Sequence, residues 1–251
     1  MSKNEIWDAD TAGAYDTPGK GMFAPDVLRP TVDRLATLAG RGRALEFAVG
    51  TGRVAIPLRE RGVEVVGIEL SDAMLHQLRT KVDEVTLPVI LGDMTTTRAP
   101  GHFLLVYLVY NTISNLLTQE EQVACFRNAA RHLGPGGRFV IELWVPDLRR
   151  LPPGQPGVVS APEPGYLLVD TYDTLHQHCT SHHFHFDEGR TARFFRSQHR
   201  YIWPGELDLM AQLAGLELES RHADWLGNEF TAESRSHISV YRLGTSPAGE
   251  V

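Results

Sequence analysis

Short apolar runs alternate with amphipathic segments between residues 43 and 144, and this alternation constrains the fold more than any other feature. It predicts strands over 44–49, 63–70, 87–91, 103–110 and 138–144, and helices over 52–61, 72–82 and 118–133. Alternation of this kind is typical of a parallel α/β sheet. The segment 103–110 is apolar throughout, as expected of a central strand that is covered on both faces.

The segments that flank this region differ from it in composition and predicted structure. Residues 26–39 predict a helix, and the Pro- and Gly-rich stretch 151–165 predicts a loop and a natural boundary. Beyond this loop, β-forming residues predict a small antiparallel sheet over 166–174, 175–186 and 191–203, with a turn at 187–189. A helix over 204–214 and strands over 216–221 and 237–243 complete the chain.

Length and charge exclude several classes of protein. A chain of 251 residues can form one large domain or two small ones. Its net charge of −7 disfavours nucleic acid as a partner. The longest apolar run ends at Tyr110 and is too short to span a bilayer, and the N-terminus has no apolar signal region. Two cysteines, Cys125 and Cys179, are too few for a disulfide framework or a cysteine-based zinc site. We therefore expect a cytoplasmic protein without a membrane partner.

A Gly-rich turn joins the first strand of the alternating region to the helix that follows. The segment 46–53 reads EFAVGTGR, and glycines in such a turn let the backbone approach a ligand while the helix presents free N–H groups. Gly50, Gly52 and Ala55 also satisfy the G-x-G-x-x-A pattern of dinucleotide-binding proteins. An ordinary strand-to-helix turn would have the same residues, so the turn alone does not define a ligand.

Acidic residues at the ends of the strands narrow the choice of ligand. Glu69 follows Gly50 by 19 positions, where a carboxylate can accept both hydroxyl groups of a ribose. Asp93, between Gly92 and Met94, can accept from an adenine amine while the methionine packs on the ring. Glu46 either faces the positively charged end of the ligand or lies at an exposed strand edge. Carboxylates at these positions favour a sulfonium or ammonium ligand over a diphosphate.

Four ordered motifs resemble those of class I S-adenosylmethionine-dependent methyltransferases. They are EFAVGTG at 46–52, GIELS at 67–71, GDM at 92–94 and LGPGGRF at 133–139. The chain is most similar to bacterial small-molecule methyltransferases, including amino-sugar N-methyltransferases, which also have an antiparallel insertion and a Tyr-Asp pair, here Tyr15-Asp16. Two positions depart from the family: Ala48 replaces a glycine and Leu104 replaces an aspartate.

The resemblance implies a fold and its divisions. The fold class is α/β, a Rossmann-like, seven-stranded, mostly parallel sheet with a small antiparallel β insertion and an N-terminal helical cap. The expected parts are the cap at 1–42, the cofactor-binding core at 43–150, the loop and insertion at 151–203, and the C-terminal part of the core at 204–251. The cap and the insertion would supply the acceptor pocket, and the insertion is a candidate surface for a homodimer.

The resemblance also implies S-adenosylmethionine as cofactor, S-adenosylhomocysteine as product, and a set of binding residues. The backbone near Ala48 would hold the methionine part, Leu70 and Met94 would enclose the adenine, and Asn111 would lie beside the methyl group. Arg53 either pairs with the cofactor carboxylate or lies on the helix surface. The full set is Tyr15, Glu46, Ala48, Gly50, Thr51, Gly52, Arg53, Glu69, Leu70, Gly92, Asp93, Met94, Tyr110 and Asn111.

The acceptor and the catalytic base are less constrained. The sequence NTIS at 111–114 lacks the N-P-P-Y motif of family members that methylate nucleobases or protein glutamine, so we expect a small-molecule acceptor. His183, Tyr15 and Asn111 are candidate bases. The histidines at 176–185 could form a polar strand face, bind a metal or face the substrate, and we assign no metal to them.

The predicted activity is methyl transfer from S-adenosylmethionine to an oxygen, nitrogen or carbon nucleophile by in-line displacement. Because the sulfonium is already activated, the protein mainly aligns the nucleophile and excludes water. Two alternatives stay open at this point. One is a nicotinamide-dependent oxidoreductase that uses the same Gly-rich turn, and the other is a non-catalytic nucleoside-binding protein.

Overall fold

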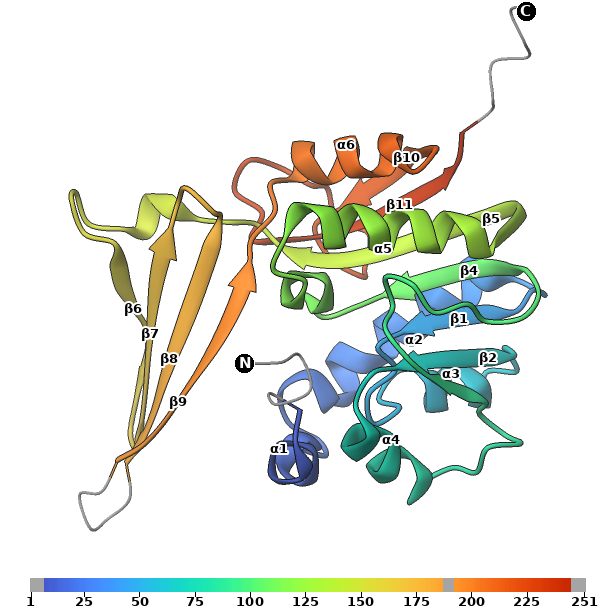
Figure 1. Cartoon of the computed structure of the whole chain (residues 1–251), viewed down its shortest axis with the longest axis horizontal. Coiled ribbons are helices and arrows are strands. Elements are labelled where there is room, and N and C mark those ends of the chain that lie inside the picture. The colour runs from blue at the N-terminus through green and yellow to red at the C-terminus, as the bar shows by residue number, and fades with distance from the viewer. Residues whose placement is uncertain (1–6, 187–191, 245–251) are drawn as a thin grey trace, which may run out of the picture.

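A computed structural model describes residues 7–186 and 192–244. Seven strands form the main sheet in the order β10-β11-β5-β4-β1-β2-β3 (Figure 1). These strands are β1 (Ala44–Phe47), β2 (Val65–Glu69), β3 (Val89–Leu91), β4 (Phe103–Leu108), β5 (Leu133–Trp144), β10 (Leu216–His222) and β11 (Ser236–Leu243). The neighbours from β5 to β3 are parallel, and β11 is antiparallel to both β5 and β10. The predicted seven-stranded, mostly parallel sheet is confirmed.

Helices cover both faces of this sheet. Phe47, Phe126 and Phe139 belong to the core on the face covered by α5 and α6, and Leu35 and Leu58 belong to the core on the face covered by α2 and α3. The helices are α1 (Ala9–Tyr15), α2 (Pro25–Ala39), α3 (Ala55–Glu60), α4 (Asp72–Arg79), α5 (Gln119–His132) and α6 (Pro204–Leu213), with 3-10 turns η1 (Gly21–Phe23), η2 (Thr112–Asn115) and η3 (Leu148–Arg150). The predicted helices are therefore present, with shorter bounds in α3 and α4.

Local capping explains where two of these helices begin. The Ser71 side chain accepts from the backbone N–H of Met74 at the start of α4. Thr118 and Glu121 form a reciprocal capping box at the start of α5. Each cap supplies hydrogen-bond acceptors to backbone donors that have no partner inside the helix.

A second, antiparallel sheet of four strands projects to one side of the main sheet (Figure 1). Its strands are β6 (Gly157–Glu163), β7 (Tyr166–Asp173), β8 (His178–Phe186) and β9 (Ala192–Arg200). The predicted insertion is confirmed, but β6 lies within the segment that the sequence predicts as loop. Proline is tolerated in β6 because this strand lies at the sheet edge. The hydrogen bonds between β6 and β7 stabilise an extended conformation that the local sequence of β6 does not predict. The turn predicted at 187–189 lies outside the described residues.

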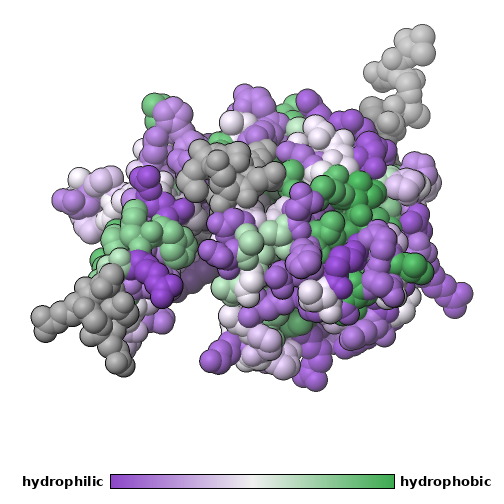
Figure 2. Space-filling view, turned by 60° about the horizontal axis from the view of Figure 1, so that its bottom comes forward, coloured by the Kyte–Doolittle hydropathy of each residue, from purple (hydrophilic) through white to green (hydrophobic). Residues whose placement is uncertain are grey.

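The antiparallel sheet exposes several large apolar side chains. Val159, Phe186, Phe194 and Phe195 are each about half exposed. Figure 2 shows the sheet as an arm on the left that carries an apolar patch, set apart from the main body. A homodimer through this arm stays a prediction. Within residues 7–186 and 192–244, none of the helices combines the length and hydrophobicity that a membrane span requires.

Candidate functional site

A cavity of about 380 Å³ lies where the parallel strands of the main sheet end. Open α/β sheets bind ligands at this edge, and the volume is within the range of small-molecule sites. Residues from the cap, the strand ends, η2 and β9 line it. They are Trp7, Tyr15, Ala48, Gly50, Ile68, Glu69, Leu70, Met74, Gly92, Asp93, Met94, Tyr110, Asn111, Thr112, Ser114, Asn115, Leu116, Leu117, Trp144, Gln198 and His199.

The Gly-rich turn after β1 forms one wall of this cavity. Ala48, Gly50 and Gly52 all have positive φ angles, of 52°, 58° and 83°. Glycine adopts this conformation without a steric penalty, whereas Ala48 adopts it at a cost. A Cβ atom at Gly52 would lie 2.9 Å from Cδ1 of Ile56, so this glycine permits close packing beneath the turn. Gly52 therefore shapes the turn without lining the cavity.

Glu69 joins the turn to the end of β2. Its Oε2 accepts from the backbone N–H of Gly50 at 2.7 Å, and its Oε1 accepts from the N–H of Ser71 at 2.8 Å. Glu69 is 5% exposed, and burial raises the pKa of its carboxyl group despite these hydrogen bonds. A carboxylate has about four acceptor positions. After two backbone N–H groups are bound, Glu69 has capacity for the hydroxyl groups of a ribose.

The third strand end contributes the residues expected beside an adenine. Asp93 and Met94 follow β3, and Leu70 follows β2; all three line the cavity. Asp93 Oδ1 accepts from the backbone N–H and the hydroxyl of Thr95, both at 2.7 Å, which fixes the carboxylate. The apolar side chains and the fixed carboxylate are suited to a flat ring that carries an amine.

Glu46 lies in the strand below the turn and does not line the cavity. It is 3% exposed, and its Oε2 accepts a hydrogen bond from the hydroxyl of Tyr107 at 2.9 Å. Burial raises the pKa of Glu46 to about 8, so the carboxyl group is protonated at neutral pH in the free protein. The alternative of an exposed strand edge is wrong, and the role of Glu46 toward a cationic ligand stays a prediction.

Thr51 and Arg53 also lie outside the cavity lining. Thr51 donates from its hydroxyl to Asp16 Oδ1 at 2.6 Å, and Asp16 pairs with Lys81. The guanidinium of Arg53 lies 5.2 Å from the ring centre of Tyr110. Both residues thus connect the turn to neighbouring segments, and direct contact with a cofactor stays a prediction for them, as it does for Gly52.

The N-terminal cap closes one side of the cavity. The rings of Trp7 and Tyr15 meet edge to face at 5.7 Å, and Phe23 packs on Tyr15 at 6.1 Å. The backbone carbonyl of Trp7 accepts from the hydroxyl of Ser71 at 2.7 Å. Tyr15 is therefore a packed aromatic residue that also lines the cavity.

Beyond the turn, the cavity continues toward η2, β5 and β9. Tyr110 and Asn111 have consecutive positive φ angles of 55° and 62°, and such strain is typical of functional sites. Glu142 Oε2 accepts from the N–H of Tyr110 at 2.8 Å, and Asn111 Oδ1 accepts from the N–H of Trp144 at 2.7 Å. These hydrogen bonds fix the end of β4 against β5.

Ser114 is a second polar feature in this half of the cavity. The residue is 1% exposed and lines the cavity. Its Oγ has no hydrogen-bond partner among the described residues. Because a buried hydroxyl without a partner is costly, this half of the cavity is suited to a ligand that carries polar groups.

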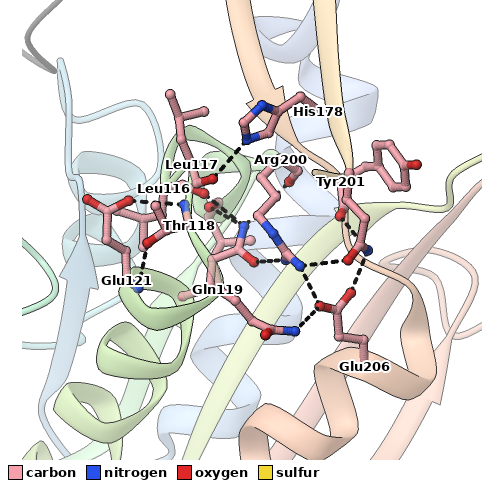
Figure 3. A network of polar contacts seen from close by, with 12 residues as sticks. Leu116, Leu117, Thr118, Gln119, Glu121, His178, Arg200, Tyr201 and Glu206 are labelled. Atoms are coloured by element: carbon pink, nitrogen blue, oxygen red, sulfur yellow. Dashed lines mark hydrogen bonds and ion pairs between the residues drawn. The ribbon is translucent and has the colours of Figure 1, made fainter. Parts of the chain in front are cut away.

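A buried polar network fixes the base of the antiparallel sheet against the main body (Figure 3). Arg200, 4% exposed, donates to Gln122, to Gln177 at 2.7 Å and to Glu206 at 2.6 Å. His178 Nε2 donates to the carbonyl of Leu117 at 3.0 Å. The network joins β8 and β9 to α5, α6 and the segment after η2, and so it positions the end of β9 at the cavity.

Sequence reasoning did not identify the residues on the far side of the cavity. Trp144 ends a predicted strand, but its backbone N–H is held by Asn111 Oδ1, a contact between two strand ends that local sequence does not predict. His199 lies outside the cluster of histidines at 176–185, and His183 from that cluster does not line the cavity. Only the fold brings β9 to η2. In the described part of the chain, no group of three or more His, Cys, Asp or Glu residues could hold a metal ion.

Comparisons with known proteins agree with this geometry. A family model described as a methyltransferase domain matches residues 44–137. The CcbJ methyltransferase structure from Streptomyces caelestis is 37% identical, with a TM-score of 0.81, and the match covers 94% of this chain and 96% of that one. The chain is 28% identical to a cypemycin N-terminal methyltransferase from a Streptomyces species, over 96% of its own length and 98% of the relative.

A third relative matches over a shorter range. The dTDP-3-amino-3,4,6-trideoxy-α-D-glucopyranose N,N-dimethyltransferase from Streptomyces venezuelae is 34% identical, over 55% of this chain and 59% of that protein. Fold, site and relatives together define a Rossmann-like transferase. The chain belongs to the S-adenosylmethionine-dependent methyltransferase family, and the predicted family is confirmed. The nicotinamide-dependent and non-catalytic alternatives are set aside.

Proposed function

We propose that this enzyme transfers the methyl group of S-adenosylmethionine to an amino nitrogen of a small molecule, such as an amino sugar or the N-terminus of a peptide. One observation carries the proposal. A single cavity is lined by the turn and strand-end residues expected to hold the cofactor and also by polar residues of η2, β5 and β9. Donor and acceptor can therefore meet in one enclosed space.

The cofactor half has groups that match the parts of S-adenosylmethionine. Glu69 would accept the ribose hydroxyls, Asp93 the adenine amine, and Leu70 and Met94 would pack on the adenine ring. The backbone of Ala48 and Gly50 would approach the methionine part. When bound, S-adenosylmethionine supplies a methyl group on a sulfonium, whose carbon–sulfur bond breaks as the new bond forms and leaves S-adenosylhomocysteine.

The acceptor half supports an amine. Asn111, Asn115 and Gln198 present amide groups, Ser114 has an unpartnered hydroxyl, and Trp144 provides an apolar wall. The names of two relatives state methylation of an amine, at a peptide N-terminus in one and on an amino sugar in the other. Alignment of the nitrogen with the methyl carbon and exclusion of water are the main contributions of such a site.

Two measurements test this function. Calorimetric titration should detect S-adenosylhomocysteine binding and no binding of NADH. Methyl transfer from labelled S-adenosylmethionine should then occur to amino sugars or short peptides with a free α-amino group, and not to the same compounds after N-acetylation. Transfer to the acetylated compounds as well would place the methyl group on an atom other than the amino nitrogen and contradict the amine assignment.

A further inference from the structure

His199 is the only imidazole among the described residues that line the cavity. It lies near the end of β9, one residue before the buried Arg200, whose network fixes this end of the strand (Figure 3). Its Nδ1 lies 3.2 Å from Oδ1 of Asn115 in η2. The ring is thus held at the cavity by Asn115 of the main body, while the Arg200 network holds the adjoining end of β9.

A chain of hydrogen-bonding groups leads from His199 along the antiparallel sheet. His199 Nε2 lies 3.1 Å from Ser197 Oγ, which lies 3.2 Å from His183 Nε2. His183 Nδ1 lies 2.8 Å from the hydroxyl oxygen of Tyr166. The ring of His183 stacks on Phe195 at 4.2 Å with an interplanar angle of 5°, which restricts its rotation. Tyr166 is partly exposed, so the chain ends at solvent.

Tyr15, Glu69 and Asp93, which also line the cavity, are less suited to accept a proton at neutral pH. Burial raises the pKa of Tyr15, which therefore stays protonated. Glu69 is occupied by two backbone N–H groups, and Asp93 is fixed by Thr95 in the cofactor half. Asn111 has no basic atom. An imidazole has the basicity that proton transfer near pH 7 requires.

We propose that His199 takes a proton from the ammonium group of the acceptor, and that Ser197, His183 and Tyr166 pass a proton from it to solvent. This inference rests on the proposed function, because an ammonium nitrogen has no lone pair and must lose one proton before it can attack the methyl carbon. His199 is then a catalytic residue, and the other three are relay residues.

Each proton in this step has a donor and an acceptor. His199 Nδ1–H donates to Asn115 Oδ1, which leaves Nε2 as the nitrogen with a lone pair. The ammonium N–H bond breaks and an N–H bond forms at His199 Nε2. His199 Nε2–H passes its proton to Ser197 Oγ, Ser197 passes its own to His183 Nε2, and His183 Nδ1–H passes its proton to Tyr166. The Tyr166 hydroxyl releases one proton to water. One proton enters the chain and one leaves it.

The surroundings of His199 and His183 keep both imidazole rings of the hydrogen-bonded chain neutral at rest. Burial, and then the neighbouring His183, lower the pKa of His199, while Asp170 opposes the shift. Burial also lowers the pKa of His183, with Asp170 opposing and His185 and His182 contributing in the same direction as burial. Both rings are therefore unprotonated near pH 7, and a proton that reaches them moves on toward solvent.

The pH dependence of His199→Gln tests the base. Glutamine can still bond to Asn115 but cannot accept a proton. With the best amine from the acceptor panel, kcat/KM should fall about 100-fold at pH 7, within the usual range for loss of a general base. It should recover toward the wild-type value as the pH approaches the pKa of the free amine. A loss of equal size at every pH, or no loss, would overturn the proposal.

Two matched controls accompany this variant. His176→Gln makes the same change at an exposed histidine in the turn between β7 and β8, which pairs with Asp173, and should leave the pH profile unchanged. Affinity for S-adenosylhomocysteine, measured by calorimetry, should be the same in His199→Gln and the wild type. Reduced affinity would mean that the glutamine disturbs the cofactor half, which contradicts a role confined to the acceptor.

Ser197 distinguishes a relay from an isolated base. Ser197→Ala interrupts the chain and should lower kcat/KM at pH 7 about 10-fold, a smaller loss than that caused by His199→Gln. Ser197→Thr keeps the hydroxyl and should retain most of the activity. Equal activity in the alanine and threonine variants would remove Ser197 and the residues beyond it from the mechanism.

A spectroscopic measurement tests the hydrogen-bonded chain from His199 to Tyr166 without any methyl acceptor. In protein labelled with ¹⁵N-histidine, signals of His199 and His183 can be assigned by their loss in the corresponding glutamine variants. Ser197→Ala should change both signals and leave that of His176 unchanged; unchanged His199 and His183 signals would refute the chain. If the wild type methylates no amine, the proposed function fails, and this measurement still decides whether the chain exists.

Discussion

The backbone N–H of Gly50 donates to Glu69 Oε2 at 2.7 Å, so the Gly-rich turn and the end of β2 hold each other in place. The other oxygen of Glu69 holds the N–H of Ser71, the residue that caps α4. One buried carboxylate thus organises the turn, the strand end and the following helix around the cavity. Its remaining acceptor positions are available to the cofactor.

Glu69→Ala should weaken binding of S-adenosylhomocysteine by about 1.5–3 kcal/mol, the usual contribution of hydrogen bonds to a charged group. The variant loses both the expected ribose contacts and the support of Gly50. Calorimetric titration measures the change. Glu64→Ala, at an exposed carboxylate just before the same strand, should bind as the wild type does. Wild-type affinity in Glu69→Ala would remove Glu69 from the site.

Ala48→Gly should stabilise the protein by about 1 kcal/mol, because Ala48 has a φ of 52° and a non-glycine residue in this conformation costs about 1–2 kcal/mol. Urea denaturation measures the change in the free energy of unfolding. Ala73→Gly provides a control in the helix α4, where the same replacement should lower stability by about 1 kcal/mol. Loss of stability in both variants would show that packing of the Ala48 methyl group outweighs backbone strain.

Local sequence was sufficient to predict the parallel strands, the family resemblance predicted the seven-stranded sheet, and several predicted site residues line the cavity. The strand-helix alternation predicted parallel strands, and the Gly-rich turn, Glu69 and Asp93 lie at the ends of three neighbouring strands that meet at one edge. The same logic places Tyr110 and Asn111 after β4. These residues are close together because each lies at the end of a parallel strand, and these strands end at the same edge of the sheet.

The acceptor half depends on tertiary contacts that no local pattern contains. His199 reaches the cavity because Arg200 binds residues of α5, α6 and the loop before β8. The strand β6 pairs with β7 although its own sequence is typical of a loop. Glu46 could not be placed either, because its burial depends on Tyr107 of β4. Residues positioned by such long-range contacts could be found only in the folded chain.

Arg200→Leu should lower the free energy of unfolding by about 3–5 kcal/mol, because it leaves the partly buried carboxylate of Glu206 without its cation. Urea denaturation measures the loss. Arg242→Leu removes an arginine from the exposed pair with Glu217 and should cost at most about 1 kcal/mol. Similar small losses in the two variants would mean that the Arg200 network does not hold the antiparallel sheet to the main body.

Glu46→Gln should change how stability depends on pH. The carboxyl group of Glu46 has a pKa of about 8 in the folded protein, above its ordinary value of 4.5. Between these values the folded state binds more protons than the unfolded state, so the contribution of Glu46 to stability is full below about pH 4.5 and is lost as the pH rises through 8. Glutamine is neutral at every pH and can still accept from Tyr107.

The difference in the free energy of unfolding between Glu46→Gln and the wild type isolates this contribution. His132 and His237 have pKa values lowered by burial to about 4, so their contributions rise with pH and oppose that of Glu46 in the total. Because both proteins contain these histidines, the difference between variant and wild type cancels their contributions.

Urea denaturation at pH 5, 6.5 and 8 should show the variant gaining stability relative to the wild type as the pH rises. Glu163→Gln, at an exposed carboxylate on β6, should run parallel to the wild type. A parallel course for Glu46→Gln as well would mean that Glu46 ionises freely in the folded protein, despite its burial against Tyr107.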